Sequence, residues 1–179
     1  MPKALMRSAM GCWSAVIFDR DGVLNLDHGY VGSPERLEWI PGARRAIKRL
    51  NDAGSRVVVA TNQSGVGRGY FTLAEVAAFH AAMQSDLAAE GAHIDAFHVC
   101  PFHPEATIEL YRHADHPDRK PNPGMILRAL AEGAIDPSRA LMVGDKASDL
   151  EAAHRAGIHG VLFEGGDLDE FLQGLALAK

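Results

Sequence analysis

The sequence has little of several features that would place a protein in a special class. It contains only two cysteines, Cys12 and Cys100, which do not make a disulfide framework and favour a reducing compartment. The net charge is −5, so no global basic field attracts nucleic acid, and no apolar run approaches membrane-spanning length. We therefore expect neither nucleic acid nor a membrane as a partner. The chain has 179 residues, of which 47% are hydrophobic, and this is enough to form one domain with a hydrophobic core.

Apolar runs alternate with helical patterns along the chain, and no repeat or low-complexity linker separates them. This alternation predicts an α/β fold, a doubly wound parallel sheet with right-handed crossovers. Thr72 and Glu75 form a capping box that predicts the start of a long helix. We expect an N-terminal extension at residues 1–13 and a single domain at 14–179. The predicted strands are 14–19, 56–60, 94–99, 140–143 and 159–163, and the other predicted helices are 41–53, 123–133, 148–156 and 168–177.

The stretch Asp19-Arg20-Asp21-Gly22 comes directly after the first predicted strand. An Asp at the carboxyl end of a parallel strand lies where open α/β sheets bind ligands. Side chains two residues apart on an extended backbone point the same way. One carboxylate can therefore attack a substrate while the other handles protons. The alternative for this pair is a turn with an Asx cap.

Further polar residues come later in the chain, and Thr61 and Asp145 follow apolar runs while Lys120 precedes a proline. Taken alone, Thr61 is typical of a helix or turn cap, and Lys120 is typical of a solvated surface lysine. Asp145 and Asp149 are typical of a helix N-terminus, where acidic side chains are favourable. Their order behind the first carboxylate pair is what favours one shared site.

Together these segments resemble the haloacid dehalogenase superfamily of phosphohydrolases. The resemblance covers nearly the whole chain from Ser14 onward and implies the Rossmann-like core of that superfamily with a minimal cap. The four segments that resemble its motifs, in order, are Asp19-x-Asp21-Gly22, Thr61-Asn62, Lys120-Pro121 and Gly144-Asp145-x3-Asp149.

The resemblance implies a phosphatase that works through an aspartyl-phosphate. Asp19 is then the nucleophile, and Asp21 is the general acid and base. Thr61 is expected to hydrogen-bond a phosphoryl oxygen, and Lys120 to offset its charge. Because a carboxylate and a phosphate repel each other, we expect Mg²⁺ as the cofactor. The implied metal ligands are the side chains of Asp19 and Asp145 and the backbone carbonyl of Asp21, with Asp149 supporting Lys120 or a metal-bound water.

A closer resemblance within the superfamily is to the D-glycero-D-manno-heptose 1,7-bisphosphate 7-phosphatases, whose nearest relatives are histidinol-phosphate phosphatases. Four segments carry it: Asn25-Leu26-Asp27-His28-Gly29-Tyr30, Thr61-Asn62-Gln63-Ser64-Gly65, Arg119-Lys120-Pro121-x-Pro123-Gly124-Met125 and Gly144-Asp145-Lys146. The resemblance implies a small phosphorylated sugar as substrate, a role in lipopolysaccharide precursor synthesis and a place in the bacterial cytoplasm. We also expect a monomer.

The same resemblance implies which residues contact the substrate. Arg119 could hold the second, non-reacting phosphate as a bidentate partner. Tyr30 could contact the sugar, and the alternative for this residue is simple packing within its loop. The implied substrate-binding residues are Asp27, His28, Gly29, Tyr30, Asn62, Gln63, Ser64, Arg119 and Lys146.

The loop that precedes the lysine motif departs from the closer family. Those relatives carry zinc ligands spaced Cys-x-His and Cys-x-Cys, whereas here Phe102 stands at the expected His and the last pair is His116 and Asp118. Cys100, His103, His116 and Asp118 could bind zinc in principle, but a structural site with one thiolate is atypical. We therefore expect no bound zinc and a loop held by its prolines, packing and hydrogen bonds.

Two alternatives to the heptose phosphatase remain open from the sequence. A histidinol-phosphate phosphatase, or a generalist acting on small phosphomonoesters, would use the same catalytic residues. A phosphate-binding or regulatory module without turnover belongs to another functional class. A panel of substrates separates the two enzymes, and a stable phosphate complex without turnover would indicate the module.

Overall fold

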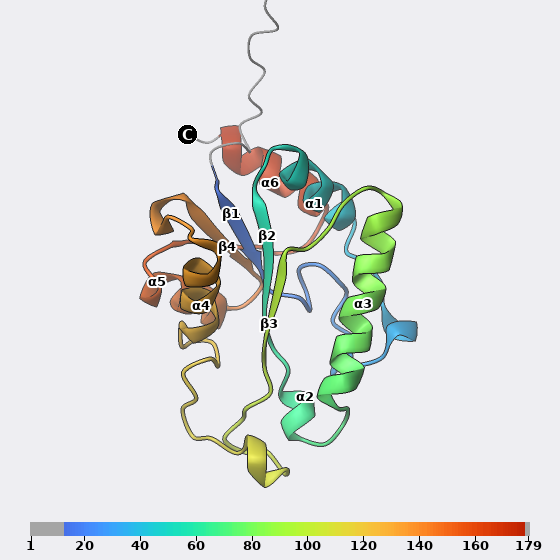
Figure 1. Cartoon of the computed structure of the whole chain (residues 1–179), viewed down its shortest axis with the longest axis vertical. Coiled ribbons are helices and arrows are strands. Elements are labelled where there is room, and N and C mark those ends of the chain that lie inside the picture. The colour runs from blue at the N-terminus through green and yellow to red at the C-terminus, as the bar shows by residue number, and fades with distance from the viewer. Residues whose placement is uncertain (1–12, 178–179) are drawn as a thin grey trace, which may run out of the picture.

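The computed structural model describes residues 13–177, so the expected extension at residues 1–13 lies outside the described residues except for Trp13. Five strands form one parallel sheet in the order β3-β2-β1-β4-β5 (Figure 1). Val16 of β1 pairs with Val57 of β2 on one side and with Leu141 of β4 on the other. The strands are β1 (Ala15–Phe18), β2 (Arg56–Asn62), β3 (Ala96–Cys100), β4 (Ala140–Gly144) and β5 (His159–Leu162).

Helices cover both faces of this sheet, which confirms the doubly wound α/β fold (Figure 1). The helices α1, α3 and α6 pack on one face, and α4 and α5 pack on the other. The helices are α1 (Ala43–Asp52), α2 (Ser64–Gly67), α3 (Leu73–Ala89), α4 (Gly124–Gly133), α5 (Ala147–Arg155) and α6 (Leu168–Leu177), and the short 3-10 helices are η2 (Pro34–Arg36), η3 (Glu109–Tyr111) and η4 (Pro137–Arg139).

Strand β1 lies in the centre of the sheet and contributes to two hydrophobic cores. Val16 and Phe18 belong to the core under α1, α3 and α6, while Ala15 and Ile17 belong to the core under α4 and α5. All four side chains are fully buried. A strand covered on both faces has no solvent-facing positions, which is why its sequence is a continuous apolar run.

The predicted elements are present with shifted ends. Helix α3 begins after Thr72, whose hydroxyl accepts from the Glu75 amide while the Glu75 carboxylate accepts from the Thr72 amide, so the predicted capping box is confirmed. Strand β2 extends two residues past its predicted end, to Asn62. The short helix α2 had no counterpart among the predicted elements, because glycine occupies two of its four positions.

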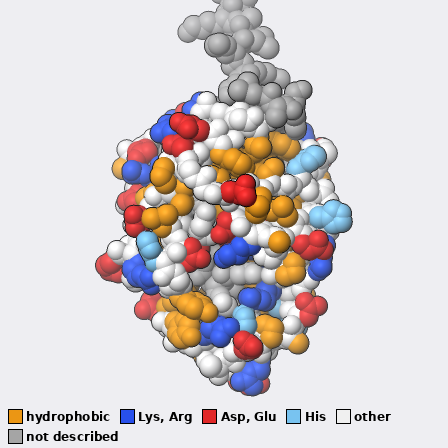
Figure 2. Space-filling model, turned by 180° about the vertical axis from the view of Figure 1, so that it is seen from behind, with side chains coloured by type: hydrophobic (Ala, Val, Ile, Leu, Met, Phe, Trp, Pro, Cys, Tyr) orange, Lys and Arg blue, Asp and Glu red, His pale blue; other side chains and the backbone are white. Residues whose placement is uncertain are grey.

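The segment between β3 and α4 is irregular apart from η3. It leads the chain from the edge of the sheet back to its centre. Lys120 therefore lies next to Asp19 after β1 and Asn62 at the end of β2. Within residues 13–177 no helix is long and apolar enough to cross a membrane. On the face seen from behind, acidic and basic side chains are interspersed (Figure 2).

Candidate active site

The carboxyl ends of the three central strands bring the four predicted motifs together. Asp19 follows β1, Asn62 ends β2 and Asp145 follows β4. A cavity of about 540 Å³ opens at these strand ends. The residues lining it are Asp19, Asp21, Asp27, Gly29, Tyr30, Asn62, Gln63, Ser64, Gly65, Arg119, Lys120, Pro121, Lys146, Ser148 and Asp149.

Lys120 is the cation that contacts the expected nucleophile. Its Nζ lies 2.9 Å from Oδ1 of Asp19 and 2.7 Å from Oδ1 of Asp149, and it donates to the Ala60 carbonyl at 2.7 Å. All three polar side chains are buried. Burial lowers the pKa of Lys120, but the carboxylates of Asp19 and Asp149 outweigh it and raise that pKa above its usual value. The ammonium therefore stays charged beside Asp19.

Asn62 fixes the backbone at Lys120. The Asn62 Nδ2 donates to the Lys120 carbonyl at 3.0 Å, and the Lys120 amide donates to the Asn62 Oδ1 at 3.1 Å. This pair of hydrogen bonds joins the end of β2 to a segment 58 residues away in the chain. These bonds therefore hold the second and third motifs in a fixed position relative to each other.

Two glycines make room for the carboxylates of the fourth motif. Gly22 has a φ of 85°, and a Cβ at this position would collide with the carboxylate of Asp145. A Cβ at Gly144 would collide with the side chain of Asp149. A larger residue at either position would force the neighbouring carboxylate out of place.

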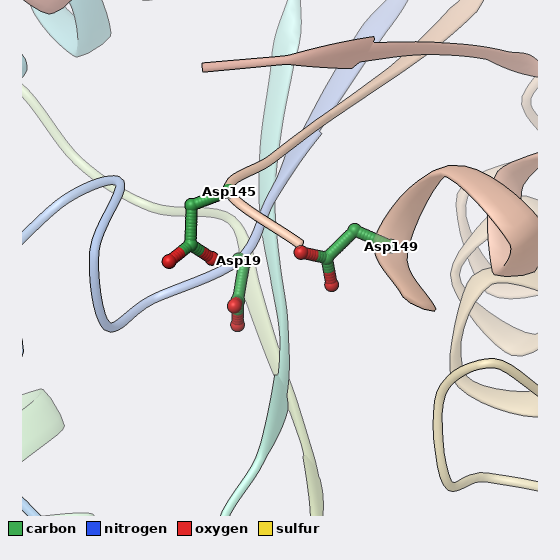
Figure 3. Close-up of side chains that lie close together, drawn as sticks. All are labelled: Asp19, Asp145 and Asp149. Carbon is green, nitrogen blue, oxygen red and sulfur yellow. The ribbon is translucent and has the colours of Figure 1, made fainter. Parts of the chain in front are cut away.

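Asp19, Asp145 and Asp149 offer carboxylate oxygens that lie within 4.8 Å of one another (Figure 3). In the part of the chain that the structure describes, Oδ1 of Asp145 is buried without a hydrogen-bond partner. Burial and the neighbouring Asp19 carboxylate raise the pKa of Asp145 to about 6. Crowded carboxylates with an unpartnered buried oxygen suit a hard divalent cation such as Mg²⁺.

The two oxygens of Asp149 are already engaged. Oδ1 lies against Lys120, and Oδ2 accepts from the Lys146 amide at 3.0 Å at the start of α5. Asp149 therefore contacts Lys120 directly. This leaves Asp19 and Asp145 as the side chains best placed to hold a cation.

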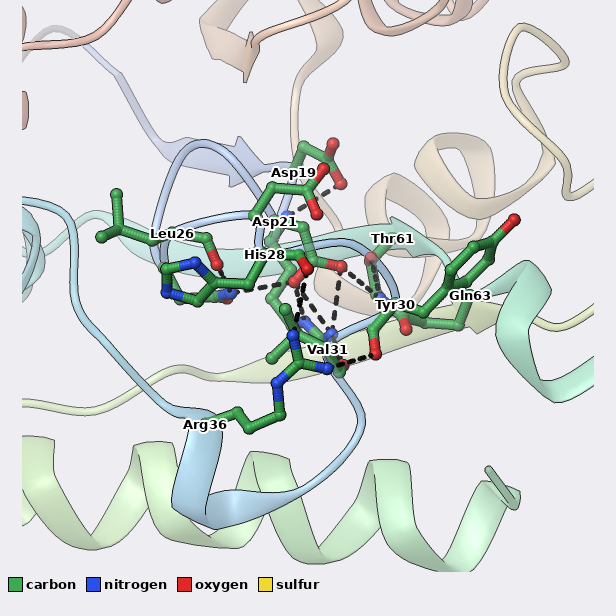
Figure 4. Close-up of polar contacts among 12 residues, drawn as sticks. Asp19, Asp21, Leu26, His28, Tyr30, Val31, Arg36, Thr61 and Gln63 are labelled. Atoms are coloured by element: carbon green, nitrogen blue, oxygen red, sulfur yellow. Dashed lines mark hydrogen bonds and ion pairs between the residues drawn. The ribbon is translucent and has the colours of Figure 1, made fainter. Parts of the chain in front are cut away.

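Asp21 is held by the side chains of three residues, Arg20 and Asn25 from its own loop and Gln63 directly after β2 (Figure 4). Its Oδ1 accepts from Asn25 at 2.9 Å, and its Oδ2 accepts from Gln63 at 2.8 Å. The Arg20 guanidinium donates to both oxygens at 2.9 and 3.0 Å. These contacts fix the orientation of Asp21 at the cavity wall.

Arg20 is fully buried, and the sequence analysis assigned it no role. It also donates to the Val31 carbonyl at 2.5 Å and lies over the Phe79 ring, 4.3 Å from the ring centroid. Its Nη1 lies 3.4 Å from Nε2 of His80, which must accept because arginine carries only donors. Burial and the Arg20 charge lower the pKa of His80 to about 3. A basic residue between two aspartates at the end of a buried strand was the available signal for this network.

Most of the predicted site residues line the cavity, but His28 from the substrate-binding set, the catalytic Thr61 and the metal ligand Asp145 are not among the lining residues. Asp145 nevertheless offers a carboxylate oxygen within 4.8 Å of one from Asp19. His28 is exposed, and its Nε2 lies 2.9 Å from Glu38. Thr61 is buried, and its hydroxyl accepts from Gln63 at 2.8 Å. The lining residues without a sequence prediction of their own are Gly65, Pro121 and Ser148.

Two further cations face the cavity beside Lys120. Arg119 donates to the Phe102 carbonyl at 3.0 Å, and burial lowers its pKa. Lys146 lies 3.8 Å from the Asp27 carboxylate. The cavity lining thus brings three cations together with four aspartates, Asp19, Asp21, Asp27 and Asp149.

The four candidate zinc ligands have other contacts. The Nδ1 of His103 accepts from the Glu105 amide, and the Nδ1 of His116 accepts from the Asp118 amide. The His116 ring stacks on Phe102 with centroids 3.7 Å apart. Asp118 pairs with Arg128, and burial raises the pKa of the Cys100 thiol. Among residues 13–177, the aspartates of Figure 3 are the only group of three or more side chains close enough to share a metal ion.

Comparison with known proteins places the chain among phosphatases. A HAD-hydrolase-like family model matches residues 118–171. The chain is 49% identical over 160 residues to D-glycero-beta-D-manno-heptose-1,7-bisphosphate 7-phosphatase of Rhodopseudomonas palustris, covering 89% of this chain and 88% of that protein. It is 44% identical over 163 residues to D-glycero-D-manno-heptose-1,7-bisphosphate 7-phosphatase of Thermosynechococcus vestitus, covering 89% and 83%.

A solved structure supports the same assignment. The crystal structure of D,D-heptose 1,7-bisphosphate phosphatase from B. bronchiseptica, complexed with magnesium and phosphate, superposes with a TM-score of 0.77 at 37% identity. The match covers 90% of this chain and 86% of that one.

Proposed function

The chain belongs to the D-glycero-D-manno-heptose 1,7-bisphosphate 7-phosphatase family of the haloacid dehalogenase superfamily, and on this basis we propose that it removes the 7-phosphate of that sugar bisphosphate. The observation that carries the proposal is the buried contact of Lys120 with Asp19, within a cavity that two further cations line. Such a site suits a substrate with two phosphates.

Asp19 is the nucleophile in this proposal. Its carboxylate attacks phosphorus, forming an Asp19–O–P bond while the bond between phosphorus and the sugar oxygen breaks. Lys120 stabilises the negative charge that spreads over the phosphoryl oxygens, and the Thr61 hydroxyl is the proposed donor to one of them. Asp149 acts through Lys120 by holding its ammonium in place.

Asp21 handles the protons. It gives a proton to the departing sugar oxygen and then takes one from the water that attacks the aspartyl-phosphate, which releases phosphate and restores Asp19. The hydrogen bonds from Asn25 and Gln63 orient the Asp21 carboxyl for both steps. Its backbone carbonyl, with Asp19 and Asp145, would hold Mg²⁺, which would neutralise charge on the nucleophile and the phosphate.

The remaining cavity residues recognise the part of the substrate that does not react. In this proposal Arg119 and Lys146, which both line the cavity, pair with the second phosphate. The loop 27–30 is expected to meet the sugar, because Asp27, Gly29 and Tyr30 line the cavity. Asn62, Gln63 and Ser64 also line the cavity and complete the proposed subsite.

A substrate panel tests this function. Phosphate release is measured with Mg²⁺ from both anomers of heptose 1,7-bisphosphate, from fructose 1,6-bisphosphate and from histidinol phosphate, with Asp19→Asn as the blank. A large preference in kcat/KM for one heptose anomer, and loss of the 7-phosphate seen by phosphorus NMR, support the proposal. Equal slow rates on all four substrates would support phosphatase activity but reject heptose bisphosphate as the preferred substrate.

A further inference from the structure

Loop 27–30 contains one residue, Tyr30, in a backbone conformation that its own side chain does not favour. Gly29 has a φ of 73°, and Tyr30, which has a Cβ, has a φ of 50°. The left-handed region is unfavourable for a residue other than glycine, so contacts from elsewhere must maintain it. The Tyr30 side chain is half-exposed and lines the cavity, so this conformation sets where its ring lies.

The Arg36 side chain, which is not part of the cavity lining, binds the backbone of the loop. The Arg36 guanidinium donates to the carbonyls of His28 at 3.0 Å, Tyr30 at 3.1 Å and Gly29 at 3.4 Å (Figure 4). Three consecutive carbonyls can reach one guanidinium because the two positive φ values curl the backbone around it. Only arginine presents enough donors in a planar fork to serve all three.

The backbone that carries the Arg36 side chain is itself held in place. Arg36 ends η2, its amide donates to the Ser33 carbonyl at 3.0 Å, and η2 lies against α3. The Tyr70 ring packs edge-on against the Tyr30 ring with centroids 4.7 Å apart. The loop is thus held on its backbone by Arg36 and on its aromatic ring by Tyr70.

We propose that Arg36 is a positioning residue for substrate selection: it holds Gly29 and Tyr30 in the conformation that meets the sugar of a sugar bisphosphate. This proposal rests on the proposed function, because it takes the loop 27–30 as the sugar-contacting wall. Arg36 contacts none of the residues that act on the transferred phosphoryl group. Its removal should therefore affect sugar recognition and leave the phosphoryl chemistry in place.

The test compares two substrates in Arg36→Ala. We expect KM for the heptose bisphosphate to rise about tenfold with kcat changed little. For p-nitrophenyl phosphate, which has no sugar, kcat/KM should stay within about twofold of wild type. Arg36→Lys should recover only part of the loss, and millimolar guanidinium ion should partly restore Arg36→Ala. Arg44→Ala, which removes an exposed arginine paired with Glu90, is the matched control and should change neither substrate.

Equal losses on both substrates, or an unchanged KM for the bisphosphate, would overturn the proposal. Wild-type activity on the heptose bisphosphate decides the proposed function separately. If wild type prefers another sugar phosphate, the same ratio is measured with that substrate. Hydrogen exchange gives a readout independent of substrate. The Gly29 amide, which donates to Oδ1 of Asp27 at 2.9 Å, should exchange faster in Arg36→Ala than in wild type, and unchanged exchange would also contradict the proposal.

Discussion

The Lys120 ammonium lies 2.7 Å from Oδ1 of Asp149, and the side chains of both residues are at most 2% exposed. A buried charge needs a partner, and here the lysine has Asp149 on one side and Asp19 on the other. Asp149 thereby lets Lys120 stay charged at the place where negative charge develops on the phosphoryl group. Asp149 of the fourth motif thus stabilises the charge of Lys120 in the third motif through a direct contact.

The role of Asp149 predicts a kinetic effect. In Asp149→Asn the amide can still accept from the Lys146 amide, but it no longer balances Lys120. We expect kcat for phosphate release to fall about 10²-fold, measured at saturating substrate and Mg²⁺. Asp169→Asn is the matched control, because Asp169 is also a buried aspartate paired with arginines, Arg45 and Arg49. A similar fall in kcat for the control would indicate general destabilisation in place of a role at the site.

The position of Arg119 predicts an effect on substrate binding. Arg119→Ala should raise KM for the heptose bisphosphate by about 10- to 100-fold, because a charge-assisted pair with the second phosphate is lost. The effect should be small for a monophosphate substrate, which has no second phosphate to bind. Steady-state kinetics on both substrates checks this, and an equal rise in KM on the two would reject the assignment.

His80 predicts how stability depends on pH. Its pKa is about 3 in the folded protein and about 6.5 when exposed, so the unfolded chain takes up a proton first as pH falls. This group alone should lower the free energy of unfolding by about 2 kcal/mol between pH 7 and pH 5. Urea unfolding of His80→Gln, in which the glutamine oxygen can still accept from Arg20, should show a smaller loss.

The exposed His154 provides the control for this measurement. His154→Gln should keep the wild-type loss of stability between the two pH values. If His80→Gln loses as much stability as wild type on acidification, the buried neutral state of His80 is not the cause.

Metal removal should show that activity depends on Mg²⁺ and that the loop containing Cys100 binds no zinc. After treatment with EDTA we expect no phosphate release, full recovery with Mg²⁺, and an increased Mg²⁺ requirement in Asp145→Asn. Elemental analysis should find zinc well below one atom per chain, and Cys100→Ala should retain activity. Stoichiometric zinc, or an inactive Cys100→Ala chain that regains activity on zinc addition, would show that the loop has a metal after all.

The elements of the fold were predictable because their signals are local. The apolar run at β1 and the Thr72–Glu75 capping box each lie within a few residues, and both are confirmed. The gathering of Asp19 and Asp145 followed from the rule that parallel strands end at one edge. Lys120 follows no strand, and its place at the site was implied only by the order of the motifs that resemble the family. Element ends were less accurate, since tertiary hydrogen bonds extend β2 to Asn62.

The supporting network was not predictable, because its contacts join distant segments. Nothing near Arg20 in the sequence indicates His80, 60 residues away, as its neighbour. The left-handed backbone conformation of Tyr30 was equally unpredictable, because it depends on the three hydrogen bonds from Arg36 to loop 27–30. His28 follows the family pattern, yet its side chain contacts Glu38 outside the cavity lining.

The covalent step at Asp19 is tested most directly by trapping the aspartyl-phosphate. Enzyme is mixed with Mg²⁺ and its best substrate, quenched within one turnover and treated with borohydride, which reduces an acyl phosphate to an alcohol. Peptide mass spectrometry should find homoserine at position 19 in wild type only when substrate is present, and never in Asp19→Asn. Phosphate release with no reduction at position 19, or with reduction at another carboxylate, would contradict the mechanism.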